Sequence, residues 1–452
     1  MNHLESQKNL ALYLKIFPLI PFIFPLYLIR FQLLFIPTNL LELTIAFSFL
    51  YLLAKKGRTI RIPIFWSWCF FLGASVLALL SSKFLSLDFI RSLGWWKGFI
   101  ATPMIFMVLF ENLPLDKKEA LMHNFILAAA LLGIGSFFAP EAFTVDGRLS
   151  GFFVSANFLA FFLSPALLSF FSVFRAREKL TSSQLSKTSQ PYDTVTTQVS
   201  TPSLKKLPNK SFPSLSKQIF QVLVFLSILV PLFFTQSYLA IFSCIFLVSV
   251  WKLLEFREEK KIDFRLFLGI FSFLILFAFA FHQTEKWQKV FDLDNRSSIS
   301  VRAQVYRVSF SFLKEHPFLG IGLGNYRKKY EIESPEILGK APFEWVMRHT
   351  HNLFLSIWLN LGFLGFLGFL NFFILVIKKV FRPDYRELDK EKKLFTWPQT
   401  DYFLYAMPFF YFALHGMLDT PFWKNDLGII FFLCLGWALN FPSKQGVNKN
   451  EE

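Results

Sequence analysis

The sequence predicts an all-α polytopic membrane protein with about 12 transmembrane helices, from its composition, the length of its apolar runs and the charges between them. Of its 452 residues, 54% are hydrophobic and only 17% are charged, whereas a soluble domain averages about 25% charged residues. This composition excludes a soluble enzyme, a disordered protein and a nucleic-acid-binding module. The apolar runs are continuous instead of alternating at period two, which argues against a transmembrane β-barrel.

Each predicted span is a stretch of mostly apolar residues near the roughly 20 that a membrane helix needs. The twelve stretches are 11–29, 32–54, 62–82, 98–112, 121–139, 151–174, 218–235, 237–255, 264–282, 351–377, 401–416 and 427–441. The fourth, eleventh and twelfth are short, and each fits a tilted or re-entrant helix as well as a full span. No small-residue cleavage site follows the first run, so we interpret it as a retained helix.

Basic residues predict the orientation of these spans. The formal net charge is +16, and with the N-terminus in the cytoplasm five consecutive inside loops gather most of the Lys and Arg. Since positive residues keep loops in the cytoplasm, both termini are expected there. The expected location is the inner (cytoplasmic) membrane of a bacterium, crossed many times.

The chain divides into five predicted segments. Residues 1–179 hold helices one to six, and 180–217 form a flexible cytoplasmic linker rich in Ser, Thr, Gln, Pro and Lys. Residues 218–282 hold helices seven to nine, 283–350 form an ordered extracytoplasmic loop, and 351–452 hold the last three helices and a cytoplasmic tail. Within the loop, 299–315 has apolar residues at helical spacing. An ordered loop of this size is usually functional, so we expect it to be a catalytic loop.

His351 is the strongest candidate for a catalytic residue. It stands in RHTHN, directly before a long apolar helix. The partial positive charge of a helix N-terminus favours the neutral imidazole, which can act as a general base near neutral pH. The alternative is a histidine that caps the helix or lies among the lipid headgroups.

Arginines on the outer side are candidates for binding a phosphate group. A guanidinium pairs bidentately with phosphate and keeps its charge. Arg302 and Arg307 lie on the helical stretch, Arg148 comes from an earlier outer loop, and Arg348 precedes His351 with a weaker claim. Together with a base, these arginines would bind a membrane-bound phosphate ester. The alternative for each arginine is a contact with lipid headgroups or solvent.

Neither a metal nor a cofactor is expected in the chemistry. The three cysteines lie in apolar runs without metal-type spacing, and acidic pairs are absent. The run from Gly320 through Gly322 to Gly324 has the wrong spacing and place for a dinucleotide fingerprint, so we predict a tight turn. Gly362, Gly365 and Gly368 are expected to allow close helix packing.

Three runs carry a resemblance to a known family. HPFLGIGLGNYRKKY, HTHNLFLSIWLNLGFLGFLGF and GRLSGFFVSANFLAFFL resemble the shared elements of the O-antigen ligase and O-antigen polymerase superfamily, over about residues 145 to 380. The matching positions are Arg148, Gly151, Asn157, Ala160, His316, Pro317, Gly320, Gly322, Gly324, Asn325, His351, Asn352, Gly362 and Gly365.

The resemblance implies transfer of a glycan from a polyprenyl-diphosphate carrier to an acceptor hydroxyl at the outer face of the inner membrane. It implies a metal-independent, inverting displacement on a GT-C-like architecture, with lipid A–core as the acceptor of a ligase. His351 would activate the acceptor hydroxyl, and Arg302 would hold the donor diphosphate. Asn157, Asn325 and Asn352 would shape the site.

One position departs from the family pattern. Similar proteins often carry Thr-x-Ser-Arg before the eighth span, but this chain has Tyr238 after Thr235, Gln236 and Ser237. A tyrosine donates a hydrogen bond without supplying charge. Either Arg148 or Arg307 substitutes for the arginine, the donor differs, or the activity is reduced.

Several functions remain open from the sequence. A polymerase that extends lipid-linked repeats and a protein oligosaccharyltransferase use the same chemistry as a ligase. A secondary transporter belongs to another class, but transporters show repeats and ionisable groups at the bilayer midplane. Here the ionisable residues gather on one face, and no repeat is evident.

Overall fold

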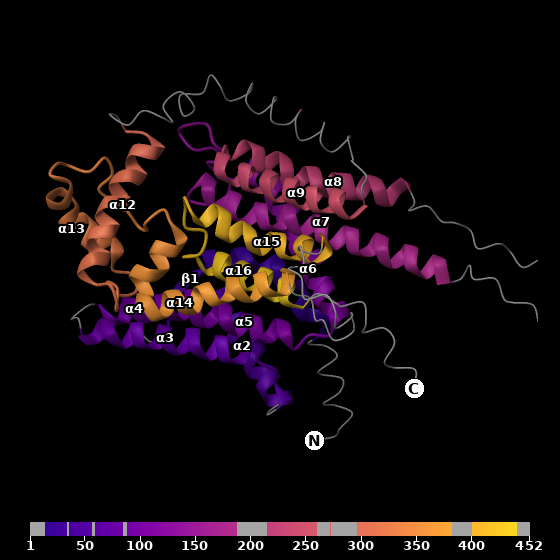
Figure 1. Cartoon of the computed structure of the whole chain (residues 1–452), viewed down its shortest axis with the longest axis horizontal. Helices are drawn as coiled ribbons and strands as arrows, with labels where there is room; N and C mark the ends of the chain where they lie inside the picture. The colour runs from indigo at the N-terminus through magenta and orange to yellow at the C-terminus, as the bar shows by residue number, and fades with distance from the viewer. Residues whose placement is uncertain are drawn as a thin grey trace, which may run out of the picture.

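The structure is a computed structural model in which most of the helices run side by side as one bundle (Figure 1). It describes residues 14–33, 36–56, 59–84, 88–187, 215–259, 272, 296–381 and 400–440. The bundle helices are η1 (Phe17–Leu28), α2 (Leu40–Lys56), α3 (Phe65–Phe84), α4 (Phe89–Trp96), α5 (Thr102–Glu111), α6 (Leu115–Gly135), α7 (Ala156–Lys187), α8 (Leu215–Phe234), α9 (Tyr238–Glu259), α14 (Leu353–Phe381), α15 (Thr400–Gly416) and α16 (Asn425–Leu439). At one end of the bundle lie α12 (Ser298–Glu315) and α13 (Tyr326–Leu338).

The bundle confirms a multi-pass membrane protein. Among the described residues, six helices are long and apolar enough to cross a membrane: 89–111, 115–138, 156–174, 215–234, 238–257 and 353–381. Three shorter apolar helices accompany them. Of the expected ninth span, 264–282, only residue 272 is described. Helix α7 continues to Lys187 and α8 begins at Leu215, so both reach into the predicted linker, whose residues 188–214 lie outside the described part.

The second span begins later than its predicted start at residue 32. Strands β1 (Arg30–Leu33) and β2 (Ile36–Asn39) form an antiparallel hairpin first, with Arg30 opposite Asn39. The Asn39 side chain then caps α2, since its Oδ1 accepts from the Glu42 backbone N–H at 2.9 Å. An Asn cap satisfies one of the unpaired N–H groups of the first turn, so the helix starts at Leu40.

The fourth span is longer than its prediction of 98–112. Helix α4 runs through a π-helical segment, Lys97–Ala101, into α5, giving a continuous helix from Phe89 to Glu111. Lys97 interrupts the apolar run in the sequence. Its ammonium is 2.6 Å from the buried Glu42 carboxylate, and this pairing lets the helix continue past a charged residue.

The helix ends at the side predicted to be cytoplasmic are joined by polar contacts. Lys118 on α6 donates to Asn440 after α16 at 2.7 Å, and Asn440 donates to Glu111 on α5 at 2.7 Å. Lys56 of α2 donates to the Asn112 carbonyl at 3.2 Å. The ends of α2, α5 and α16 and the start of α6 therefore lie together, as the alternating topology predicts.

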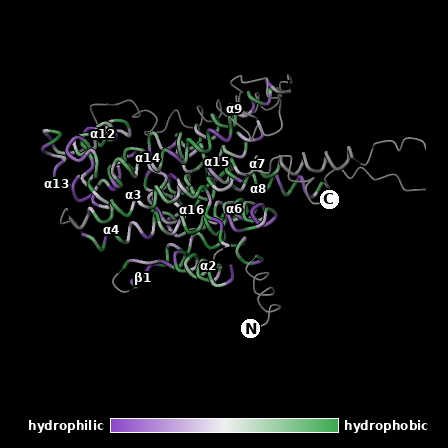
Figure 2. The backbone as a smooth tube through the Cα atoms, turned by 60° about the horizontal axis from the view of Figure 1, so that its bottom comes forward, coloured by the Kyte–Doolittle hydropathy of each residue, from purple (hydrophilic) through white to green (hydrophobic). Residues whose placement is uncertain are grey.

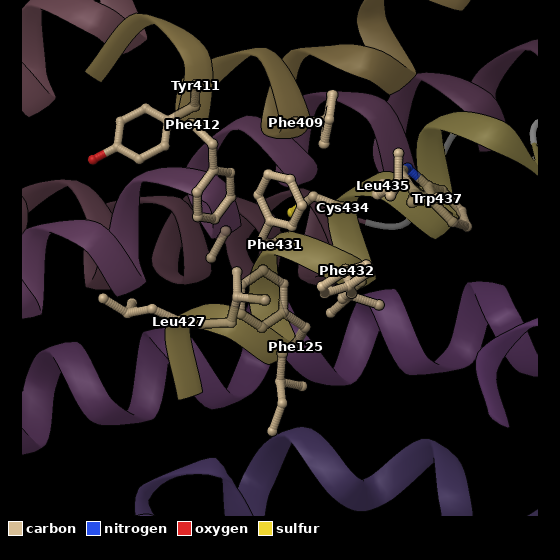
Figure 3. Packing of buried hydrophobic residues seen from close by; sticks show 14 of the residues in the cluster. Phe125, Phe409, Tyr411, Phe412, Leu427, Phe431, Phe432, Cys434, Leu435 and Trp437 are labelled. Carbon is tan, nitrogen blue, oxygen red and sulfur yellow. The ribbon is translucent and has the colours of Figure 1, made fainter. Parts of the chain in front are cut away.

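Helix α16 lies inside the bundle. Although it is short, contacts with the neighbouring helices hold it there. Its Phe431 is fully buried and lies next to Phe412 of α15 (Figure 3). The ring centroid of Phe431 is 5.3 Å from that of Phe412, 5.2 Å from that of Phe369 and 5.3 Å from that of Phe422. The pair with Phe369 is stacked and the other two are edge-to-face, and such aromatic pairs add to the stabilisation that burial gives. This packing fixes α16 and therefore the turn that precedes it.

Helices α12 and α13 share a small hydrophobic core with the start of α14. Val305, Val308 and Phe312 of α12 are fully buried against Tyr326 and Tyr330 of α13. Hydrophilic residues are frequent along α13, whereas most of the bundle is hydrophobic (Figure 2). The helix predicted over 299–315 is confirmed as α12, whose first turn is capped reciprocally by Ser297 and Ser300.

A break in α14 lets the turn before α13 hydrogen-bond to the α14 backbone. Gly362 has φ of +71°, and a Cβ there would lie 2.4 Å from the Phe318 carbonyl oxygen. The Phe363 N–H donates to that carbonyl at 2.8 Å, and Ile321 N–H donates to Leu359 O at 2.7 Å. The prediction that Gly362 allows close helix packing is therefore wrong, because Gly362 interrupts the helix. Gly368 does pack closely, because its Cβ would lie 3.1 Å from Phe71 Cα.

Candidate active site

His351 and Asp419 form the centre of the site. The His351 Nδ1 lies 3.2 Å from the Asp419 Oδ1. His351 stands in the turn before α14, and Asp419 in the turn between α15 and α16. The Asp419 side chain is buried, while His351 is partly exposed. A ring nitrogen of a solvent-accessible histidine is thus held by a buried carboxylate.

Two further residues predicted for the site join this pair through hydrogen bonds. The Asn157 amide donates to the Asp419 Oδ2 at 3.1 Å. The Arg148 Nη2 donates to the Asn157 Oδ1 at 2.6 Å, and its Nε donates to the Thr235 carbonyl at 3.0 Å. The start of α7, the end of α8, the start of α14 and the turn after α15 therefore meet in one polar network, on the side that the topology predicts to be outside the cytoplasm.

Arg302 approaches the same carboxylate from α12. Its Nε donates to the Leu418 carbonyl at 2.8 Å and its Nη1 to the Ser298 carbonyl at 2.9 Å. Its Nη2 lies 4.0 Å from the Asp419 Oδ2. Because a guanidinium has five N–H donors, these contacts leave donors for an anionic ligand. The structure brings Arg302 and His351 together, as the sequence predicts.

The Asp419 carboxylate is ionised in this surrounding. Burial alone would raise its pKa, but the hydrogen bond from His351, with His351, His415 and Arg302 close by, holds the pKa well below its usual value. An ionised carboxylate only accepts hydrogen bonds. It therefore favours the His351 tautomer with the proton on Nδ1, which leaves Nε2 free to accept a proton.

The backbone at His351 is unusual. Its φ is +50°, a region that non-glycine residues seldom adopt and that the surroundings must hold in place. Asn352 caps α14, since its Oδ1 accepts from the Leu355 N–H at 2.9 Å. The helix cap is therefore Asn352, and the imidazole of His351 is left for another role.

A second histidine lies beside the first. The rings of His349 and His351 are 5.3 Å apart between centroids, and burial, with His351 nearby, lowers the pKa of His349 to about 4. The ligand atoms of His349, His351 and Asp419 lie within 4.8 Å of one another, whereas ligands on one tetrahedral zinc are about 3.4 Å apart. The arrangement fits a hydrogen-bonded pair with a neutral neighbour; metal-free chemistry remains a prediction.

Three other predicted residues lie less centrally. Arg307 and Arg348 are exposed, and within the described part of the chain neither is hydrogen-bonded to the His351–Asp419 pair. Tyr238 begins α9, is half-buried and lies within electrostatic range of Arg148.

The glycine-rich turn before α13 packs against α4 and α14. Gly320, Gly322 and Gly324 all have positive φ, which confirms the predicted tight turn. The Gly324 N–H donates to the Asn360 side chain at 3.0 Å, and a Cβ at Gly324 would lie 3.0 Å from the Trp95 ring. Asn325 ends the turn and donates to the Leu323 carbonyl at 3.2 Å. The turn thereby fastens α13 to α4 and α14.

Residues 222–370 match the family model described as O-antigen ligase. This match supports an O-antigen ligase superfamily membrane protein. The matched segment holds Arg302, Tyr238 and His351, whereas Arg148, Asn157 and Asp419 lie outside it. A search of curated proteins finds none that matches the chain. The candidate active site is thus completed by residues on either side of the matched segment.

Asp419 is the residue that the sequence analysis did not assign to the site. It lies in the turn between the last two predicted spans. The sequence signal that could have identified Asp419 is its position: a carboxylate between two apolar helices, on the same predicted side of the membrane as His351. Its partner lies 68 positions earlier, so only the fold reveals the contact.

Proposed function

We propose that the protein transfers a glycan from a polyprenyl-diphosphate carrier to an acceptor hydroxyl at the outer face of the bacterial inner membrane. The observation that carries this proposal is the His351–Asp419 pair beside Arg302, within and next to a segment of the O-antigen ligase family. A base, a buried carboxylate that orients it and a guanidinium are the groups that such a transfer needs.

His351 acts as the base in this proposal. Its Nε2 removes the proton from the acceptor hydroxyl while the oxygen attacks the anomeric carbon. The bond from that carbon to the diphosphate oxygen breaks, and attack from the opposite face inverts the anomeric configuration. Asp419 keeps the imidazole oriented and stabilises the imidazolium that forms, which afterwards returns its proton to the bulk solvent or to the departing diphosphate. The step needs no metal ion.

The arginines stabilise the leaving group. The diphosphate gains negative charge as the glycosidic bond breaks, and preorganised cations in a partly buried site favour that charge. Arg302 supplies its remaining N–H donors. Arg148 binds the carbonyl of Thr235, in the turn where relatives carry an arginine at the place of Tyr238. This contact supports Arg148, more than the exposed Arg307, as the residue that substitutes for the missing charge.

We propose a ligase with lipid A–core as acceptor, and polymerisation of lipid-linked repeats is the alternative. A transporter fits less well, because the described polar network lies at the helix ends instead of halfway along them.

The glycans of a strain that lacks the protein test this proposal, with surface and lipid-linked pools analysed separately. Lipid-linked polymer accumulating beside a bare lipid A–core is the expected result. A core that carries a single repeat, with no ladder in either pool, would mean a polymerase. Unchanged pools would contradict glycan transfer by this protein.

A further inference from the structure

Tyr306 connects α12 to the backbone of His351. It lies four residues after Arg302, and is therefore on the same face of α12. Its hydroxyl is 2.9 Å from the His351 carbonyl oxygen and 3.3 Å from the Met417 carbonyl oxygen. The ring is half-buried. The contact goes to the main chain of His351, so it leaves the imidazole free.

The hydroxyl has one proton to donate, and the geometry selects its acceptor. Met417 O is the more distant of the two carbonyls, at 3.3 Å against 2.9 Å, and it also accepts from the Asn352 amide at 2.9 Å. The proton of Tyr306 is therefore directed to His351 O. This hydrogen bond holds a peptide whose residue has φ of +50°, a conformation that persists only where neighbours determine it.

Helix α12 thus positions both members of the central pair. Tyr306 holds the His351 backbone, and Arg302 holds the turn of Asp419 through the Leu418 carbonyl at 2.8 Å. Rotation of the His351 peptide would swing Nδ1 away from the Asp419 Oδ1. It would also move Nε2 from the place where an acceptor hydroxyl must approach.

We propose that Tyr306 is a positioning residue whose hydroxyl fixes the His351 peptide, so that the imidazole is aligned with Asp419 and with the acceptor. The inference rests on the proposed function of His351 as the base. Tyr306 touches neither substrate in this scheme, so its loss affects the rate of the chemical step more than binding of the donor.

The test compares Tyr306→Phe with Tyr326→Phe in purified full-length protein. Both variants lose one phenolic hydroxyl within the α12–α13 unit; that of Tyr326 contacts Ser309 Oγ at 2.8 Å and has no contact with His351. Tyr306→Phe should lower kcat roughly tenfold to a hundredfold, as small misplacements of a catalytic group do, with unchanged KM for the lipid-linked donor and unchanged melting temperature. Tyr326→Phe should keep the wild-type kcat.

Amide hydrogen exchange supplies a readout that does not depend on activity. Exchange in peptides that cover 350–353 should rise in Tyr306→Phe and stay at the wild-type level in Tyr326→Phe. A wild-type kcat in Tyr306→Phe would overturn the inference. It would also be overturned if Tyr306→Phe and Tyr326→Phe lost kcat to the same extent. If wild-type protein transfers no glycan, the proposed function fails. Unchanged exchange at 350–353 would then overturn the positioning role as well.

Discussion

Asn157 donates a hydrogen bond to Asp419 at 3.1 Å, although 262 positions separate the two residues in the sequence. The other oxygen of the same carboxylate contacts His351. One buried side chain therefore joins the start of α7, the start of α14 and the turn before α16. Because both oxygens of the carboxylate have partners, a substitution at any of these partners should change the orientation of His351, the proposed base.

His351→Ala should reduce glycan transfer by at least about a thousandfold, because the acceptor hydroxyl loses its base. The side chain is partly exposed, so protein level and membrane insertion should not change. Transfer is measured with purified protein, and level by immunoblot of membranes. His316→Ala, a half-buried histidine of the same outer segment, is the matched control and should stay active. Full activity of His351→Ala would remove this residue from the mechanism.

Asp419→Asn should lower kcat about a hundredfold to ten-thousandfold, since the neutral amide neither stabilises the imidazolium nor selects the required tautomer. The shape of the side chain is kept, so the donor KM should change little. Asp88→Asn is the control, because Asp88 caps α4 and Asn is an equally good cap. Equal rates for Asp419→Asn and wild type would show that the carboxylate charge is not used.

Arg148→Ala should raise the donor KM and lower the rate, because one cation near the diphosphate is lost. Adding Tyr238→Arg to this variant should restore part of the activity, since the family resemblance implies an arginine at that turn. Tyr238→Arg alone should accumulate normally, as Tyr238 is half-buried at the start of α9. Steady-state kinetics of the three variants decide the matter. If the double variant is no better than Arg148→Ala, Arg148 is not the substitute for that arginine.

Gly362→Ala should lower the melting temperature strongly, because φ of +71° disfavours alanine and its Cβ would meet the Phe318 carbonyl at 2.4 Å. Gly73→Ala in α3 is the control. A Cβ at Gly73 meets nothing within 4 Å, and alanine favours a helix by about 1 kcal/mol over glycine. Thermal unfolding in detergent compares the two. Equal melting temperatures would mean that the break in α14 is not needed for the fold.

The sequence predicts much of the fold because hydropathy and loop charge report directly on the membrane. Alternating the spans predicts that Arg148, Asn157, Arg302 and His351 lie on one side of the membrane. Their contacts with one another and with Asp419 show that the four residues lie together. Helix α12 follows from apolar periodicity. These inferences need no knowledge of which helices touch.

What the sequence could not show depends on such contacts. Lys97 interrupts an apolar run, and only its pairing with Glu42 at 2.6 Å explains why the helix continues. Gly362 has the spacing of a packing glycine, but the Phe318 carbonyl makes it a break. Asp419 gains its role from His351 and Asn157, which arrive from distant parts of the chain.

The most direct test of the central claim is transfer by purified wild-type, His351→Ala and Asp419→Asn protein in lipid nanodiscs. The donor is a polyprenyl-diphosphate-linked glycan, the acceptor is lipid A–core, and the products are separated by gel electrophoresis. The account predicts that wild-type protein forms glycan-bearing lipid A–core, that His351→Ala forms none and that Asp419→Asn forms it slowly. Equal product from all three proteins would contradict it.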